Sequence, residues 1–576
     1  MSETDVTGRV KPATLIYDVD ENPGIGPLII LGIQHIFVLT IAFVFPIIII
    51  DAIGGKSDDA RHLISMAMLV TGAATILQGL NRGPVGSGYL CPLVNGPAFL
   101  SASILAGKVG GLSLIFGMTF IGGLFETLFS RVAARMRAVF PAEVTGTIVT
   151  MVGIEVIPFG VKRFFGLDAT HPEFDPTSTV VAMITLAAMM GFTVWGKGKL
   201  RLYSVLIGML IGYIAACLWG VLGLAQFAQI SASPWFLLPT IGSYGMTFNL
   251  ALIIPFLVAS LSSALKTMGD LTTCQKINDA GWKRPDMKSI SKGILACASG
   301  NLLSGLTGAL GQSPSSSNIG LSIATGATSR TIAYATGGIL MVLAFFPKIA
   351  SIFVIMPTPV MGASLIFAAS FMVIAGIQIM LSRMIDARKT FVIGTSIVFG
   401  LSVDLIPGLY KNLPNGIQPF FQSSLSLATI CAIVLNLFLR IGISRKASIE
   451  LVPRVDSSEK VFAFMQRQGG LWGAMPDVIS RAASAINETL ETTASASIAD
   501  SPLQVVVSFD EFNLDVEITY AGRLIEFPEG MPTEEEILAS PEGIAKLSMF
   551  IIRRNADRLE SDIKEGLCHI RLHYNH

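Results

Sequence analysis

Apolar stretches of about 20 residues recur along most of this chain, and this repetition constrains the fold more than any other feature. Each stretch is long enough to cross the hydrocarbon core of a bilayer, about 30 Å thick, as an α-helix. Of the 576 residues, 52% are hydrophobic and only 14% are charged, whereas soluble domains carry about 25% charged residues. The sequence therefore predicts an all-α polytopic membrane protein, and its formal net charge of zero gives no basis for binding nucleic acid.

The apolar stretches divide into about 14 predicted spans. Basic residues follow the fourth, sixth, eighth, twelfth and last of them, although Lys162 and Arg163 lie in an opposite loop. The positive-inside rule then predicts cytoplasmic termini, and we expect the cell (inner) membrane as the location. The first 25 residues are polar and lack the apolar core of a cleaved signal peptide. The predicted spans lie near residues 27–50, 62–80, 90–106, 111–130, 142–160, 178–196, 201–223, 249–268, 290–308, 318–328, 331–352, 358–380, 390–407 and 421–440.

Two spans are interrupted at corresponding places, the third of seven and the tenth of fourteen. Gly96 and Pro97 break the first half of the third span, and the polar stretch 311–320 leaves only about half an apolar span in the tenth. Such pairs of short, interrupted segments indicate a 7+7 inverted repeat with a binding site between two half-helices near the midplane. Two ordinary kinked helices are the alternative. They are disfavoured because irregular backbone at membrane depth is tolerated only where it is buried or lines a cavity.

Four groups of residues in these spans resemble the motifs of one family. Ser317-Asn318-Ile319-Gly320, followed after four residues by Thr325-Gly326, resembles the signature of the nucleobase–ascorbate transporters, also called the nucleobase:cation symporter-2 family. Gln34-His35 matches the Gln-His pair of the family's first span, and Gly96-Pro97-Ala98-Phe99 matches the Gly-x-x-Phe of its third. Lys266-Thr267-Met268-Gly269-Asp270 corresponds to the Glu-x-x-Gly-Asp of its eighth. By these four motifs the membrane part is identified as a member of this family, of the xanthine/uracil permease type.

The resemblance implies a core domain and a gate domain that move against each other in an elevator-type cycle, with short β segments before the two half-helices. Family members usually move uracil, xanthine, urate or related bases with a proton, and some animal members move ascorbate with sodium. We therefore expect a symporter and a homodimer, neither an enzyme nor a binder of a cofactor. The expected parts are an N-terminal tail (1–25), a membrane domain (26–445) with core spans (26–130 and 249–352) and gate spans (142–223 and 358–440), and a cytoplasmic C-terminal domain (446–576).

Two positions that hydrogen-bond the base in this family differ here. The family has Glu in the eighth span and Gln or Glu in the tenth, where this chain has Lys266 and Ser317. From the resemblance we expect a substrate site made of Ala98, Phe99, Lys266, Asp270, Ser316, Ser317 and Asn318. The residues expected to support it or to take part in coupling are Gln34, His35, Gln312 and Thr325.

The charge of this site has two interpretations. The half-helix N-termini carry partial positive charge, so a free Lys266 would favour an anionic ligand such as a urate- or xanthine-like anion or a small carboxylate. Alternatively, Lys266 and Asp270 lie four residues apart on one helix and pair with each other. Asp270 and His35 are candidates for coupling a proton, although the Gln34-His35 pair and Asn318 are more simply interpreted as scaffold.

Other polar residues are interpreted without a substrate role. Glu126, Glu155 and Asp404 lie in or at the ends of spans and are expected to hydrogen-bond within the core or gate. The six cysteines are scattered and form no CxxC pair, so no motif indicates a metal site or a disulfide framework. Three functions remain open in order of preference: a nucleobase-like transporter, a transporter-like membrane sensor, and a small-anion permease of the sulfate or bicarbonate type.

From about residue 455 the composition becomes that of a soluble α/β domain. We expect a helix over 476–493, a hairpin of strands 504–509 and 514–520, a helix from Pro541 through Arg558, and a last strand. This order resembles the GHKL fold of histidine-kinase-type ATPases. Asn487 corresponds to the family's nucleotide-binding Asn, but the loop after Tyr520 lacks the acid and the second glycine of the Asp-x-Gly-x-Gly motif. A domain that regulates or dimerises without hydrolysing ATP is therefore expected.

Overall fold

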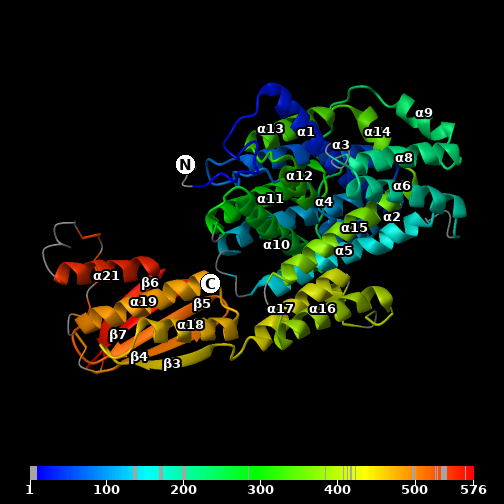
Figure 1. The fold of residues 1–576 in the computed structure, drawn as a ribbon. Coiled ribbons are helices and arrows are strands. Elements are labelled where there is room, and N and C mark those ends of the chain that lie inside the picture. The colour runs from blue at the N-terminus through cyan, green and yellow to red at the C-terminus, as the bar shows by residue number, and fades with distance from the viewer. Residues whose placement is uncertain are drawn as a thin grey trace. The chain divides into compact units, whose positions relative to one another are not determined.

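The computed structural model forms two compact units, Met1–Leu439 and Arg440–His576 (Figure 1). The first is a bundle of apolar helices and the second is a sheet with helices. The structure describes residues 9–575 except 134–135, 137–138, 168–172, 198–202, 283–284, 383–384, 407, 411–412, 415–417, 422, 496–497, 500, 526, 529, 533–540 and 565.

The first half of the membrane unit has its helices in the predicted order. Its elements are α1 (Ile25–Leu39), η1 (Thr40–Phe43), α2 (Val44–Ile53), α3 (Ser57–Gly79), β1 (Leu93–Asn95), η2 (Pro97–Phe99), α4 (Leu100–Val132), α5 (Ala142–Phe164), α6 (Pro176–Val194), α8 (Ser204–Leu218) and α9 (Leu224–Ala232). The predicted third and fourth spans are one element, α4, which is broken at Gly110 and Gly111. The short α9 was not predicted, and residues 201–202 of the predicted seventh span lie outside the described residues.

The second half repeats this arrangement. Its elements are η4 (Leu250–Leu252), α10 (Ile253–Ile277), α11 (Met287–Thr307), β2 (Gln312–Pro314), α12 (Ser316–Thr325), α13 (Arg330–Leu343), α14 (Pro347–Val354), α15 (Thr358–Met380), α16 (Ala387–Leu405), η5 (Gln418–Phe421) and α17 (Ser424–Leu439). The predicted eleventh span is bent by 88° between α13 and α14. By length and composition alone, seven helices of the described chain qualify as membrane spans, or eight if that bent pair counts as one.

The contacts between helices confirm the 7+7 repeat. The fourth span, α4, packs along the ninth, α11, and the eleventh, α13, packs along the second, α3. The sixth and seventh spans, α6 and α8, pack together as do the thirteenth and fourteenth, α16 and α17. The fifth and twelfth spans, α5 and α15, pack on each other. When each span is replaced by the one seven places away, the α4–α11 contact becomes α13–α3 and the α6–α8 contact becomes α16–α17. The α5–α15 contact is replaced by itself.

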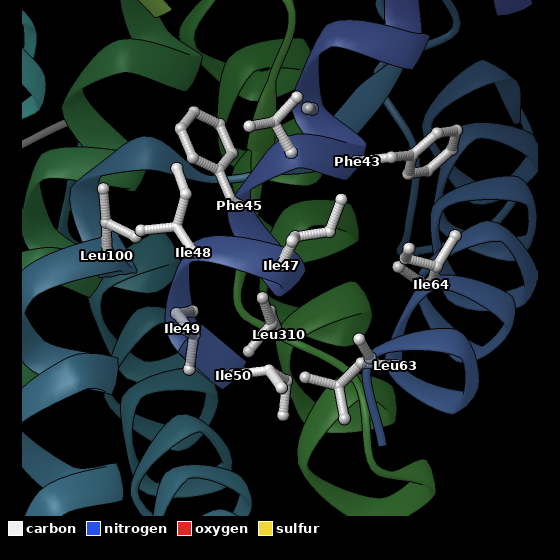
Figure 2. Packing of buried hydrophobic residues seen from close by; sticks show 14 of the residues in the cluster. Phe43, Phe45, Ile47, Ile48, Ile49, Ile50, Leu63, Ile64, Leu100 and Leu310 are labelled. Atoms are coloured by element: carbon white, nitrogen blue, oxygen red, sulfur yellow. The ribbon is translucent and has the colours of Figure 1, made fainter. Parts of the chain in front are cut away.

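The apolar core of the membrane unit is built around α2. Ile47, Ile48 and Ile50 of this helix are at most 4% exposed. Figure 2 shows the side chains of α2 between Leu100 of α4 and Leu63 of α3, in one buried cluster. Because these contacts fix α2 against the start of α4, they hold the region where the interrupted spans meet.

The second unit is a five-stranded antiparallel sheet in the order β3-β4-β5-β7-β6. Buried and open residues alternate along β4 and β5, so one face of the sheet forms the core with the helices. The strands are β3 (Arg445–Leu451), β4 (Leu503–Phe509), β5 (Asn513–Tyr520), β6 (Arg558–Lys564) and β7 (Leu567–Asn575), and the helices are α18 (Ser458–Trp472), α19 (Pro476–Ser495) and α21 (Pro541–Asn555).

The predictions for this unit need three corrections. β3 and α18 were not predicted, and the final strand is a hairpin of β6 and β7. The helix expected to continue through Arg558 ends at Asn555. The reason is that the amide of Asp557 donates to the carbonyl of His573 at 2.9 Å, which turns the backbone into the sheet.

Glycines bring α5 and α15 into close contact. Gly146, Gly153 and Gly160 recur every seven residues on α5, and a Cβ at Gly153 would lie 2.9 Å from the backbone nitrogen of Val373 on α15. Gly376 faces them, since a Cβ there would lie 2.4 Å from the backbone nitrogen of Thr150. Small residues permit this approach in membrane helices.

Gly376→Ala should therefore destabilise the membrane unit. The added methyl meets backbone that must move, and overpacking of this kind costs about 1–3 kcal/mol. We expect a lower midpoint of thermal unfolding for the purified protein in detergent. Gly394→Ala on α16 is the matched control, because a Cβ there has nothing within 4 Å. Equal midpoints for the two variants would contradict the contact.

Candidate functional site

Two short strands bring the interrupted spans together. β1 pairs antiparallel with β2, with Asn95 opposite Gln312. The amide of Gly96 donates to the carbonyl of Gly311 at 2.7 Å, and the amide of Ser315 donates to that of Pro92 at 2.9 Å, which extends the pairing at both ends. Each strand leads directly into a helix, η2 and α4 in one case and α12 in the other. The starts of two helices therefore lie side by side within buried, hydrogen-bonded backbone.

Lys266, Asp270 and Ser316 form a hydrogen-bonded cluster at this point. The Nζ of Lys266 lies 2.9 Å from Oδ2 of Asp270, and their side chains are 11% and 14% exposed. The hydroxyl of Ser316 donates to the same carboxylate at 2.9 Å and 3.0 Å. Lys266 also donates to the carbonyl of Pro314 in β2. The cluster therefore ties α10 to β2 and to the first turn of α12.

Of the two interpretations of the charge of this site, the geometry matches the one in which Lys266 pairs with Asp270. Lys266 and Asp270 neutralise each other across one turn of α10. Two of the three N–H groups of the ammonium are directed to Asp270 and to the carbonyl of Pro314. The cluster thus presents hydrogen-bonding groups without a net charge.

The other residues of the expected substrate set differ in exposure. Phe99 and Ala98 are only 1% and 5% exposed. The ring of Phe99 lies against Gly311, where an added Cβ would come within 2.5 Å of it, and its centroid is 6.5 Å from that of Phe256. Ser317, in the first turn of α12, is exposed. Phe99 therefore packs within the protein, and the Ser317 hydroxyl is the most accessible group of the set.

His35 and Asn318 have the geometry expected of a scaffold. The Nδ2 of Asn318 lies 2.9 Å from Nδ1 of His35 and donates to the His35 carbonyl at 3.0 Å. Its Oδ1 accepts from the hydroxyl of Ser315 at 2.7 Å. The amide nitrogen can only donate, so Nδ1 of the ring accepts and Nε2 carries the proton. Gln34 donates instead to the hydroxyl of Tyr203 at 3.0 Å, just before α8.

Gln312 is the centre of a buried polar network. Its Nε2 donates to Oδ1 of Asn95 at 3.0 Å, and its Oε1 accepts from the hydroxyl of Thr71 at 2.9 Å. Its carbonyl accepts from the hydroxyl of Ser263 at 3.1 Å and from Nδ2 of Asn301 at 3.3 Å. Thr71, Asn95, Ser263 and Asn301 were not predicted as site residues from the sequence. Small polar residues inside apolar spans were the signal that could have found them.

Two residues of the family signature, Thr325 and Gly326, lie at the C-terminal end of α12. The hydroxyl of Thr325 donates to the carbonyl of Leu321 at 2.9 Å. Gly326 ends the helix with φ of +64°, and a Cβ there would lie 2.8 Å from the carbonyl of Thr14. The carbonyl of Gly326 accepts from the amides of Ile16 and Tyr17 at 2.8 Å and 3.0 Å. Glycine at this position therefore allows the N-terminal tail to bond to the end of the half-helix.

Comparisons with known proteins bear on the family and the fold. The model of a family of xanthine and uracil permeases, described as the permease family, matches residues 26–409. A candidate purine permease of Clostridium perfringens is 32% identical over 432 residues, 74% of this chain and 93% of that protein. The xanthine permease XanQ of Escherichia coli (strain K12) is 26% identical over 463 residues, 78% of this chain and 98% of that protein. The solved structure of SLC26A9 has the same fold, with a TM-score of 0.50 and 11% identity over 75% of this chain and 68% of that one.

The Lys266–Asp270 pair predicts that two single variants are less stable than the double variant would suggest if the residues were independent. Removing one partner of a buried ion pair leaves an uncompensated charge and costs about 3–5 kcal/mol. Lys266→Met and Asp270→Asn should each lower the midpoint of thermal unfolding, and the double variant should recover most of the loss. Measured midpoints complete a double-mutant cycle. A double variant as unstable as the sum of its parts would contradict the pair.

Proposed function

This chain belongs to the xanthine/uracil permease family, and from that premise we propose that it carries a purine-type nucleobase across the membrane together with a proton. Membership of a permease family makes it a membrane transporter rather than an enzyme. Relatives named for purine and for xanthine transport support the substrate class.

The Lys266–Asp270–Ser316 cluster is the observation that carries this proposal. It lies where α12 begins, beside the start of the other interrupted span. A binding site between half-helices is typical of secondary transporters. The Ser317 hydroxyl and the first amides of α12 can meet a planar ligand that has both N–H and C=O groups along one edge. Purine bases of the xanthine type have such an edge.

The neutral pair favours an uncharged base over an anion. A free lysine would attract an anion, but Asp270 lies 2.9 Å from Lys266 and cancels its charge. What remains is the partial positive charge of the half-helix start, which suits the carbonyl oxygens of a neutral base. We therefore propose that the neutral form is the transported one.

Transport would proceed by movement of the core spans against the gate spans. The polar contacts between them include Gln34 with Tyr203 at 3.0 Å and Arg163 with Asp51 at 3.2 Å. We propose that both contacts are exchanged when the core moves. Cytoplasmic termini, an inner-membrane location and a homodimer complete the proposal, on the basis of the basic loops and of the family resemblance.

The C-terminal unit would regulate or dimerise rather than hydrolyse ATP. Asn487 donates to Glu491 on its own helix at 2.9 Å. The residues after β5, Ala521-Gly522-Arg523-Leu524, provide no acid and only one glycine for a phosphate loop. The GHKL resemblance therefore concerns the order of elements and not the phosphate chemistry.

We expect the purified full chain to release no phosphate from Mg-ATP above the level of the Asn487→Ala variant. Malachite-green detection of free phosphate measures this. Hydrolysis that Asn487→Ala abolishes would show that the unit is an ATPase.

Proteoliposomes test the transport proposal directly. With an inward proton gradient and the membrane potential clamped, the protein should accumulate radiolabelled xanthine. The limit is about tenfold per pH unit for one proton per base. A protonophore should reduce the internal concentration to the external one.

Competitors test the substrate class. Unlabelled purine bases should reduce xanthine uptake, whereas sulfate, bicarbonate and small carboxylates should leave it unchanged. Ligand binding without any uptake would instead favour the sensor, and competition by the inorganic anions would favour the anion permease.

A further inference from the structure

Glu126 is a buried carboxyl group that the substrate cluster does not include. It lies on α4 and is 0% exposed. Its Oε2 accepts from Nδ2 of Asn301 at 2.6 Å, and its Oε1 accepts from the hydroxyl of Ser263 at 3.3 Å. Both donors are neutral, and no ion pair found in the described part of the chain includes Glu126. A buried carboxylate with only neutral partners is costly, so binding a proton relieves an unfavourable charge at this position.

The two donors of Glu126 are shared with the backbone of β2. The Ser263 hydroxyl lies 3.1 Å from the carbonyl of Gln312, and Nδ2 of Asn301 lies 3.3 Å from it. A hydroxyl has one proton, so Ser263 donates either to Glu126 or to Gln312. The ionised carboxylate is the stronger acceptor, because hydrogen bonds to charged groups are about twice as strong as neutral ones. Protonation of Glu126 would release Ser263 to the strand.

The strand connects this exchange to the substrate cluster. Gln312 begins β2, and Pro314, two residues later, accepts from Lys266. Ser263 lies one turn before Lys266 on α10, and its carbonyl accepts from the hydroxyl of Thr267 at 2.8 Å. A change in the hydrogen bonding of Ser263 therefore acts on both elements that hold the cluster.

Titratable and charged groups also lie on the elements that pack against α4. From α11, the thiol of Cys297 lies 3.3 Å from the hydroxyl of Ser263. On α10, Lys266 and Asp270 are paired with each other. On α2, Asp51 is paired with Arg163. The basic residues Lys276, Lys288 and Lys292 lie toward the α10–α11 connection.

Resting on the proton-coupled transport proposed above, we infer that Glu126 binds the coupling proton and controls the substrate cluster through Ser263, Asn301 and Gln312. An O–H bond forms on Glu126 when a proton enters from one side of the membrane, and it breaks when the proton leaves on the other. No other covalent bond changes. Glu126 is thus a positioning residue that acts on the substrate through its shared donors.

Glu126→Gln tests the inference in the full chain in proteoliposomes. The variant keeps the shape of the side chain and cannot bind the proton. We expect it to exchange radiolabelled xanthine between equal pools, while its accumulation ratio under a proton gradient falls to one. Glu155→Gln on α5 is the matched control, because Glu155 is also buried, 4% exposed, and lies outside the network. The control should accumulate xanthine as the unmodified protein does.

The outcomes separate the two proposals. If the unmodified protein and Glu126→Gln accumulate xanthine equally, the role of Glu126 is overturned and proton coupling stands. If the unmodified protein exchanges xanthine but never accumulates it, proton coupling fails and the role of Glu126 falls with it.

Ser263→Ala is a second, independent test of the inference if Glu126→Gln fails to fold. It keeps the carboxyl group and removes the shared hydroxyl. Its accumulation ratio should fall below that of the unmodified protein, and an unchanged ratio would overturn the inference. Glu126→Asp, which retains a titratable group, should accumulate xanthine with one proton per base, and an accumulation ratio of one would also count against it.

Discussion

The pairing of β1 with β2 is the constraint on which the membrane unit depends. Backbone that leaves the helical path at membrane depth must find partners inside the protein, because lipid offers none. The two interrupted spans satisfy this need with each other, through three facing residue pairs and the flanking bonds to Gly311 and Pro92. The same pairing places two helix starts side by side. The proposed binding site for a small polar solute lies between these helix starts.

The polar residues around the paired strands β1 and β2 form two connected layers. The layer of Lys266, Asp270 and Ser316 lies at the start of α12 and carries no net charge. The deeper layer centres on Gln312 and reaches Glu126 through two shared donors. Since the layers meet at β2 and α10, a proton bound to Glu126 in the deeper layer would change the hydrogen bonding available to the other layer. This connection would link the movement of a neutral solute to a proton gradient.

Much of the fold could be predicted from the sequence, because apolar length and Gly/Pro interruptions report directly on membrane spans. The interrupted third and tenth spans, the short strands and the seven-span repeat are all present. Span boundaries at Gly110 and in the bent α13–α14 pair depend on packing between distant segments, which one sequence does not reveal. The same holds for Ser263, Asn301 and Tyr203, whose partners are far away along the chain. In the second unit, β6 was hidden because its strand forms only through pairing with β7.

A ligand-bound structure tests the central claim most directly. The full chain in lipid nanodiscs, imaged by cryo-electron microscopy with saturating xanthine, should show the base between the starts of η2 and α12. The base should lie within hydrogen-bonding distance of Ser317 or of the Lys266–Asp270 pair. Density for the base elsewhere in the membrane unit, or a lysine released from Asp270 to bind an anion, would contradict the account.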